Sequence, residues 1–319
     1  MIGLLDFILL GSGGSMPSLG RHLSSAIINY QGRKVLIDCG EGNQIAMRKV
    51  HSGFKTVDII CITHFHGDHI FGLPGLLSTM GKSGRIKPVT IIGPTGLKKI
   101  IEGFLMTMSK TPYDIKLIED PKVRLKLGIA NGILQVNAKD NCPDTNMILS
   151  TIELEHSVPC LGYDFYILRK PKFNVEKAVK LGIPKEKWSR LQNGEEIYYN
   201  NVIYTPDMIL GKARKGIKIS YIVDTRPMEI IPDFIAESDL FICEGTYGDE
   251  GDLKKAIDNK HMIFKEAAQL AVAGRVKQLL ITHFSPSIAD PDIYKQNAIS
   301  IFKNTVIGYD GYRKTLSFE

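Results

Sequence analysis

The sequence has few cysteines, a single tryptophan and no hydrophobic run long enough to span a membrane. The five cysteines are odd in number and include no CxxC pair, and Cys61 and Cys243 lie inside apolar runs that predict buried strands. These features argue against a disulfide framework and against a cysteine zinc site. The apolar run Leu4–Leu10 is short and interrupted by Asp6, so we interpret it as a first strand and not a signal sequence. We therefore expect a reducing, cytoplasmic compartment and no membrane partner.

The size and composition are those of an ordinary globular protein. At 319 residues the chain fits one large α/β domain or two smaller ones. Hydrophobic residues make up 44% of the sequence and charged residues 23%, which is sufficient for a substantial core. The net charge of +6 permits an anionic partner such as nucleic acid, although many basic proteins bind none.

A dense cluster of metal-capable side chains follows the short β-branched run Val57–Ile62, which predicts a buried strand. His64 and His66 are two residues apart, so they project to the same side of an extended chain, as ligands of one ion must. Asp68 and His69 follow a glycine, where the chain can turn, and they can face a second ion. The alternative is a polar loop with incidental histidines, but three of the eight histidines lie here.

Three further polar residues share the position of this cluster at the end of an apolar strand: His156, Asp224 and His283. Each of them alone is more often a structural polar residue. Together with the cluster they make a set of five imidazoles and two carboxylates. A nitrogen and oxygen ligand set of this kind suits zinc and needs no thiolate.

Strand and helix signals alternate in the first third of the chain, and a β-rich stretch follows from Asp114 to Glu155. This order argues against a simple doubly wound parallel sheet. The glycine-rich turn Gly11–Ser15 follows the first strand without a lysine in P-loop register. We interpret it as a tight loop that borders the site and not as a phosphate-cradling loop.

Two basic segments leave their purpose open. The segment from about 164 to 201 carries eight lysines and arginines against five acids, and it has prolines and a glycine that punctuate two short helices. It is either a solvated helical insertion or an arm that touches a polyanion. Gly211–Lys218 has four cations and no acid, and we interpret it as a solvated turn or as a loop that contacts phosphates.

The HxHxDH pattern with the later strand-end residues resembles that of the metallo-β-lactamase fold hydrolases, over the whole chain. The resemblance is closer still to the ribonuclease Z family, which trims tRNA 3′ trailers. The segment that follows His156 is similar to that family's fourth-ligand segment, and Lys215–Pro227 looks like its basic loop and bridging aspartate. His261 with Glu266-Ala267-Ala268 resembles its additional catalytic histidine motif.

The resemblance implies an α/β fold (α+β in some schemes), namely a four-layer αββα metallo-β-lactamase sandwich. We expect one domain over residues 1–319, with an inserted arm at about 164–201. The chain would be a zinc-dependent phosphodiesterase, an endoribonuclease that acts on tRNA precursors or another phosphodiester, and a homodimer.

The resemblance also assigns the site residues. His64, His66 and His156 would hold one Zn²⁺, while Asp68, His69 and His283 would hold the other and Asp224 would bridge them; Mn²⁺ or Fe is possible in place of zinc. Asp68 and His261 would be catalytic, the first by orienting or deprotonating the attacking water and the second as a proton donor. Glu244 would orient His261, or would be a structural carboxylate at a strand end.

Other functions are compatible with the same residues. One alternative is a hydrolase of a small phosphodiester, sulfate ester or lactone, in which the arm serves another purpose. A second alternative is a non-catalytic nucleic-acid-binding module, but the complete set of metal ligands argues against it. A di-iron, oxygen-reducing member of the superfamily is a third, but such proteins usually carry a carboxylate at the position of His66.

Overall fold

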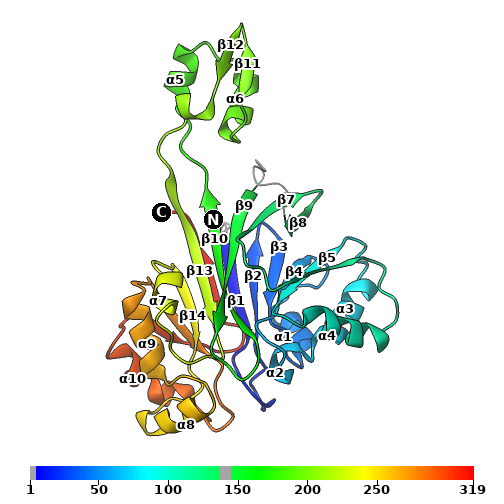
Figure 1. Cartoon of the computed structure of the whole chain (residues 1–319), viewed down its shortest axis with the longest axis vertical. Coiled ribbons are helices and arrows are strands. Elements are labelled where there is room, and N and C mark those ends of the chain that lie inside the picture. Colours follow the sequence, from blue (N-terminus) through cyan, green and yellow to red (C-terminus); the bar gives the residue numbers. More distant parts are fainter. Residues whose placement is uncertain (1–4, 137–144) are drawn as a thin grey trace.

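The computed structural model describes residues 5–136 and 145–319, in which two large sheets pack face to face and helices cover both outer faces (Figure 1). The first sheet has seven strands in the spatial order β17-β1-β2-β3-β4-β5-β6. Their bounds are Leu5–Gly11 (β1), Ser25–Tyr30 (β2), Arg33–Ile37 (β3), Val57–Cys61 (β4), Val89–Gly93 (β5), Ile115–Glu119 (β6) and Arg313–Leu316 (β17).

The second sheet has eight strands in the order β16-β15-β14-β13-β10-β9-β7-β8. Their bounds are Leu125–Ala130 (β7), Ile133–Val136 (β8), Thr145–Leu154 (β9), Cys160–Arg169 (β10), Arg214–Ile222 (β13), Leu240–Glu244 (β14), Leu279–Thr282 (β15) and Thr305–Ile307 (β16). The β-rich stretch predicted from Asp114 to Glu155 supplies the last strand of the first sheet and three strands of the second.

The helices are short. Those of the sandwich are Asn43–Lys49 (α1), Gly67–Ile70 (α2), Leu73–Lys82 (α3), Leu97–Met106 (α4), Ile231–Phe234 (α7), Leu253–Asp258 (α8), Phe264–Ala273 (α9) and Lys295–Ile299 (α10), with 3₁₀ turns at Glu250–Asp252 (η2) and Pro291–Tyr294 (η3). Within 5–136 and 145–319, no helix has both the length and the apolar character that crossing a membrane would require.

Strand residues alternate between two cores, which produces the four layers. In β1, Phe7 and Leu9 pack in the core between the sheets, together with Phe165 of β10. Ile8 and Leu10 point the other way, into the core that α1 and α3 cover. A third core lies between the outer face of the second sheet and α9. The arrangement confirms the predicted αββα sandwich, and the four described cysteines are free and buried.

Parallel pairing brings several strand ends to the same edge of each sheet. Strand β3 pairs in parallel with β4, and β13, β14 and β15 are parallel neighbours. Because the carboxyl ends of parallel strands lie at one edge, the residues that follow these strands are neighbours in space. Because the two sheets also pack face to face, the fold gathers the segments after β4, β13 and β15, which carry most of the predicted site.

An arm leaves the sandwich between β10 and β13 and extends well beyond it (Figure 1). It contains Val175–Lys180 (α5), Lys185–Gln192 (α6), Ile197–Tyr199 (β11), Val202–Tyr204 (β12) and the 3₁₀ turn Pro206–Met208 (η1). It has a small core of its own, and the rings of Phe173 and Trp188 lie 5.2 Å apart.

The bounds of the arm differ from the expected 164–201. Strand β10 continues in the sheet to Arg169, which pairs with Arg214, so the projecting part is 170–213. The apolar residues Phe165 and Ile167 keep the start of the expected segment in the core between the sheets.

The interpretation of one basic segment was also wrong. The segment Gly211–Lys218 is not a loop throughout, because β13 begins at Arg214. Two of its cations have partners: Arg214 donates to the Lys170 carbonyl, and Lys215 pairs with Glu237 at 2.8 Å. His261 precedes α9, which begins at Phe264 and in which Glu266 accepts a hydrogen bond from the Ile263 N–H.

A buried ion cluster joins the two sheets away from the site. Asp58 of β4 accepts hydrogen bonds from Arg33 (2.5 Å), Arg85 (3.1 Å) and the Leu134 N–H of β8 (2.8 Å). The side chains of Asp58 and Arg85 are 0% and 1% exposed. Removal of one partner would leave a buried, uncompensated charge.

We therefore expect Asp58→Ala to lower the free energy of unfolding by about 3–5 kcal/mol, as a shift of the urea midpoint would show. The matched control is Glu153→Ala, which removes an exposed pair with Lys122 and should cost less than about 1 kcal/mol. Equal midpoints for the two variants would contradict the prediction.

Candidate metal centre

The structure brings all seven predicted ligand residues together at one edge of the sandwich. His64 and His66 follow β4, Asp68 and His69 lie in α2, His156 follows β9, Asp224 follows β13 and His283 follows β15. Their nitrogen and oxygen atoms form overlapping groups, and the ligand atoms of each group lie within 4.8 Å of one another.

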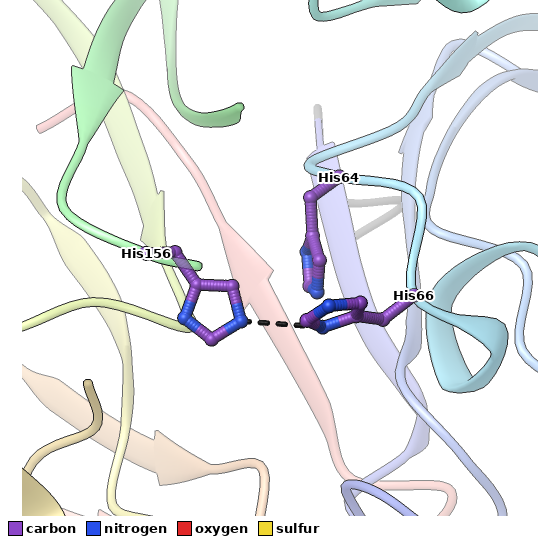
Figure 2. A group of neighbouring side chains, drawn as sticks. All are labelled: His64, His66 and His156. Atoms are coloured by element: carbon purple, nitrogen blue, oxygen red, sulfur yellow. Dashed lines mark hydrogen bonds between the residues drawn. The ribbon is translucent and has the colours of Figure 1, made fainter. Parts of the chain in front are cut away.

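The first group consists of His64, His66 and His156, whose rings point toward one another from two separate segments (Figure 2). His156 Nε2 lies 3.2 Å from His66 Nδ1. The ring centroids of His64 and His66 are 4.6 Å apart, so their two-residue spacing does place them side by side. Three nitrogens that converge in this way could hold one metal ion.

The second group consists of Asp68, His69 and His283. The Nε2 atoms of His69 and His283 are 3.2 Å apart. Asp68 Oδ2 lies 3.4 Å from the first of these nitrogens and 3.5 Å from the second. This second set of two nitrogens and one oxygen could hold another ion.

Asp224 lies between the two groups with one oxygen toward each. Its Oδ1 is 4.0 Å from His64 Nε2 and 3.9 Å from His156 Nε2. Its Oδ2 is 3.2 Å from both His69 Nε2 and His283 Nε2. This is the geometry expected of a carboxylate that bridges two ions.

The chemistry of the donors fits a cation. His64 Nε2 and Asp224 Oδ2 are buried, and neither has a hydrogen-bond partner among residues 5–136 and 145–319. A buried polar atom without a partner is costly, and a positive ion between such atoms would satisfy them. The donor set contains no thiolate, which suits borderline or hard divalent ions.

Strong electrostatic coupling shifts the pKa values of these residues. Burial raises the pKa of Asp224, but His283 and His69 outweigh burial and hold it well below its usual value. Burial likewise raises the pKa of Asp68, but His69 and His283 outweigh burial and hold this pKa far below its usual value. Both carboxylates are therefore ionised at neutral pH. Burial and the neighbouring His69 lower the pKa of His64 well below its usual value, so His64 is neutral and can act as a ligand.

A polar layer that the sequence analysis did not assign orients the ligands. His69 Nδ1 donates to Asp38 Oδ2 at 2.8 Å, and Asp38 also accepts the Thr63 N–H at 2.8 Å. Thr63 Oγ1 lies 3.1 Å from His64 Nδ1. Partners on Nδ1 direct Nε2 of each ring into the centre. The signal for Asp38 was present, because it ends an apolar strand as Asp224 does.

Glu244 and Thr246 support the opposite side. Glu244 is buried and accepts hydrogen bonds from the backbone N–H groups of Thr225 (2.6 Å) and Met262 (2.9 Å). It also lies 3.2 Å from His261 Nδ1. Thr246 Oγ1 donates to Glu244 at 2.7 Å and lies 3.1 Å from His283 Nδ1. Glu244 thus contacts both the backbone and His261, and so combines the two roles that the sequence left open.

His261 lies beside the centre without belonging to either group of three described above. Its Nδ1 is 3.8 Å from Asp224 Oδ1. Burial lowers its pKa, but the carboxylates of Glu244 and Asp224 raise it to about 9. The imidazole is therefore protonated at neutral pH and available as a proton donor.

The backbone at three of these positions is strained. Asp38, Asp224 and His283 have φ values of 56°, 55° and 62°, in the left-handed region that residues with a Cβ rarely adopt. Each conformation costs roughly 1–2 kcal/mol. The sharp turns at these strand ends direct the three side chains back toward the centre.

The centre opens into a cleft of about 480 Å³. The residues that line it besides the predicted ligands and His261 are Gly14, Ser15, Gly67, Ser157, Thr246, Tyr247, Asn259 and Ser285. The glycine-rich turn thus borders the site, as the sequence indicated. Ser15 contributes a backbone N–H that donates to Asp68 Oδ2 at 2.5 Å.

Comparisons with known proteins identify relatives of this chain. The family described as Anti-Pycsar protein Apyc1 matches residues 5–119, less than half of the chain. A ribonuclease Z of Alkaliphilus oremlandii (strain OhILAs) is 56% identical over 319 residues, which are 99% of this chain and 100% of the relative.

Two solved structures share the fold. Human tRNase Z, short form, has a TM-score of 0.66 at 22% identity and covers 98% of this chain and 99% of its own. The metallo-β-lactamase fold protein YhfI from Bacillus subtilis has a TM-score of 0.65 at 17% identity, and the match covers 97% of this chain and 99% of YhfI. The chain therefore has the metallo-β-lactamase fold.

Gly14 provides a test of the second group. A Cβ at this position would lie 2.5 Å from His283 Nε2, so the imidazole would have to move. We expect Gly14→Ala to weaken metal binding by roughly 10- to 100-fold, as for other changes beside a ligand, and to lower the metal content of purified protein measured by mass spectrometry. Gly103→Ala is the control, because its Cβ would meet open space in α4. Equal metal content in the two variants would refute the prediction.

Proposed function

Because the chain belongs to the ribonuclease Z family and is therefore a hydrolytic nuclease, we propose that it is the endoribonuclease that removes 3′ trailers from tRNA precursors. The observation that carries the proposal is the position of Asp224, whose two oxygens face two separate groups of ligand residues. Sites for two ions a short distance apart are typical of enzymes that cleave phosphodiesters by in-line displacement.

In this proposal the seven residues hold two divalent ions. His64, His66 and His156 would hold one, Asp68, His69 and His283 would hold the other, and Asp224 would contribute to both. Zinc suits this nitrogen-rich set, and Mn²⁺ or Fe is the alternative. When bound, the two ions supply a nucleophilic water at neutral pH and neutralise charge on the phosphoryl oxygens.

The protein's own groups position and move protons. The Ser15 N–H holds the carboxylate of Asp68, which orients the attacking water or accepts its proton. His261 carries a proton because its pKa is about 9, and Glu244 holds its Nδ1, which leaves Nε2 to donate. As the phosphorus–oxygen bond breaks, His261 protonates the departing 3′ oxygen, so the tRNA ends in a 3′-hydroxyl.

The arm supports RNA as the substrate. It extends far from the centre (Figure 1), and it presents exposed lysines such as Lys177, Lys180 and Lys185. A small ester that fits the cleft would not reach these cations, whereas a tRNA precursor could contact the metal centre and the lysines of the arm together. We also propose, from family membership, that the protein works as a cytoplasmic homodimer.

The first test is cleavage of a 3′-extended tRNA with mapped ends. We expect a cut that leaves a 3′-hydroxyl at the nucleotide after the acceptor stem, loss of activity on chelation and its return with Zn²⁺ or Mn²⁺.

His261→Asn should lower kcat for this substrate by about 10²- to 10⁴-fold with little change in KM, because it removes the proton donor. Turnover of bis(p-nitrophenyl) phosphate alone, with no salt-sensitive RNA binding, would favour a small-ester hydrolase instead.

A second test separates the arm from the centre. The triple variant Lys177→Gln, Lys180→Gln, Lys185→Gln should raise KM for tRNA and reduce the salt slope of RNA binding by up to about 3, or about one for each phosphate contact. Its hydrolysis of bis(p-nitrophenyl) phosphate should not change. Lys98→Gln with Lys99→Gln and Lys110→Gln removes three exposed cations outside the arm and is the matched control. An equal loss in both triple variants would count against a role of the arm.

A further inference from the structure

Asp310, which lies between β16 and β17, holds two separate points of the loop that joins β1 to β2. Its Oδ1 accepts hydrogen bonds from Ser12 N (2.9 Å) and Ser12 Oγ (2.8 Å). Its Oδ2 accepts from His22 N (2.6 Å) and lies 2.7 Å from His22 Nδ1, which donates to it. One carboxylate therefore binds four donors, two at each end of the loop 12–22.

This contact differs from an ordinary surface ion pair. The side chains of His22 and Asp310 are each only 17% exposed, and two of the four donors are backbone N–H groups, whose position the chain path determines. Asp310 is itself anchored, because Gly308 N donates to the Ile281 carbonyl and Gly311 N to the Leu9 carbonyl, both at 2.8 Å. The carboxylate is thus a fixed point to which the loop is attached.

Between its two attachment points the loop touches the second ligand group. Ser15 N donates to Asp68 Oδ2 at 2.5 Å, and Gly14 packs against the ring of His283 so closely that a Cβ would not fit. In the described part of the chain, no hydrogen bond joins residues 12–22 to His64, His66 or His156. The loop therefore acts on one group of ligands and not on the other.

We propose that Asp310 is a positioning residue that sets the metal affinity of the second group by holding the loop 12–22 against Asp68 and His283. The inference rests on the proposed two-metal function and deepens it. Hydrogen-bond partners that orient ligands typically change metal affinity by 10- to 100-fold, and here the orientation passes through the backbone of Gly14 and Ser15.

The variant Asp310→Asn removes this function with little change in size. Its amide presents one carbonyl and one NH₂ group, so it can accept from only one end of the loop and places a donor against the donors of the other end. One attachment point is then lost, and Ser15 N moves from Asp68. The control is Asp292→Asn, which makes the same change at a side chain that is 66% exposed in η3.

The experiment is a calorimetric titration of chelator-treated full-length protein with Zn²⁺, repeated with Co²⁺ to follow the visible spectrum of each site. Wild type and Asp292→Asn should bind two ions. Asp310→Asn should bind the first ion with unchanged affinity and the second roughly 10- to 100-fold more weakly. In a His283→Ala background, which already disables the second group, Asp310→Asn should have no further effect on the remaining ion.

Several outcomes would overturn the inference. Unchanged affinity for both ions in Asp310→Asn, or an equal loss at both sites, would show that the loop does not act selectively on the second group. If this variant does not fold, His22→Ala decides, because it removes one donor and leaves the carboxylate: an unchanged second affinity would count against the inference. A wild-type protein that binds fewer than two ions would instead refute the proposed function itself.

Discussion

The central constraint on this protein is the buried carboxylate of Asp224, which lies among five imidazoles and faces two ligand groups at once. A carboxylate can do this only if both of its oxygens face nitrogens from different segments of the chain. Asp224, which follows β13, must therefore lie between the segments that follow β4 and β15. Parallel pairing through β14 aligns the ends of β13 and β15, and the packing of the two sheets brings the end of β4 beside them. The left-handed backbone at Asp224 and His283 is a local cost of the same requirement.

A second layer of polar residues orients the side chains of the centre. Asp38, Thr63 and Thr246 occupy the Nδ1 side of His64, His69 and His283, so that Nε2 of these three rings faces inward. Glu244 connects His261 to the backbone of two other segments. Because these groups are buried and hydrogen-bonded, they hold the rings in place before any ion arrives, and the centre is largely preorganised.

The candidate metal centre and the arm are separate parts of the molecule. The centre lies at the sheet edge, in a fold that proteins at 22% and 17% identity share. The arm leaves the sandwich after Arg169, packs around its own core and carries its cations away from the centre. We propose that the centre cleaves the phosphodiester and that the arm selects RNA, a division that lets one metal chemistry act on a large substrate.

The sequence by itself predicted the candidate ligand residues, because their positions depend on local patterns, while the layers of the fold were expected from the family resemblance. The two-residue spacing of His64 and His66 on an extended chain predicted their common ion, and apolar strands that end in a polar residue indicated His156, Asp224 and His283. Only the tertiary structure revealed the contacts that join distant segments. Asp38 binds a histidine 31 residues away, and Asp310 binds a loop 288 to 298 residues away. The same limit explains why Arg214 was expected in a loop, since its strand forms by pairing with β10. Periodicity and spacing describe how a side chain is presented along its own element, whereas the hydrogen-bond partner of that side chain is decided by which distant segment packs beside it.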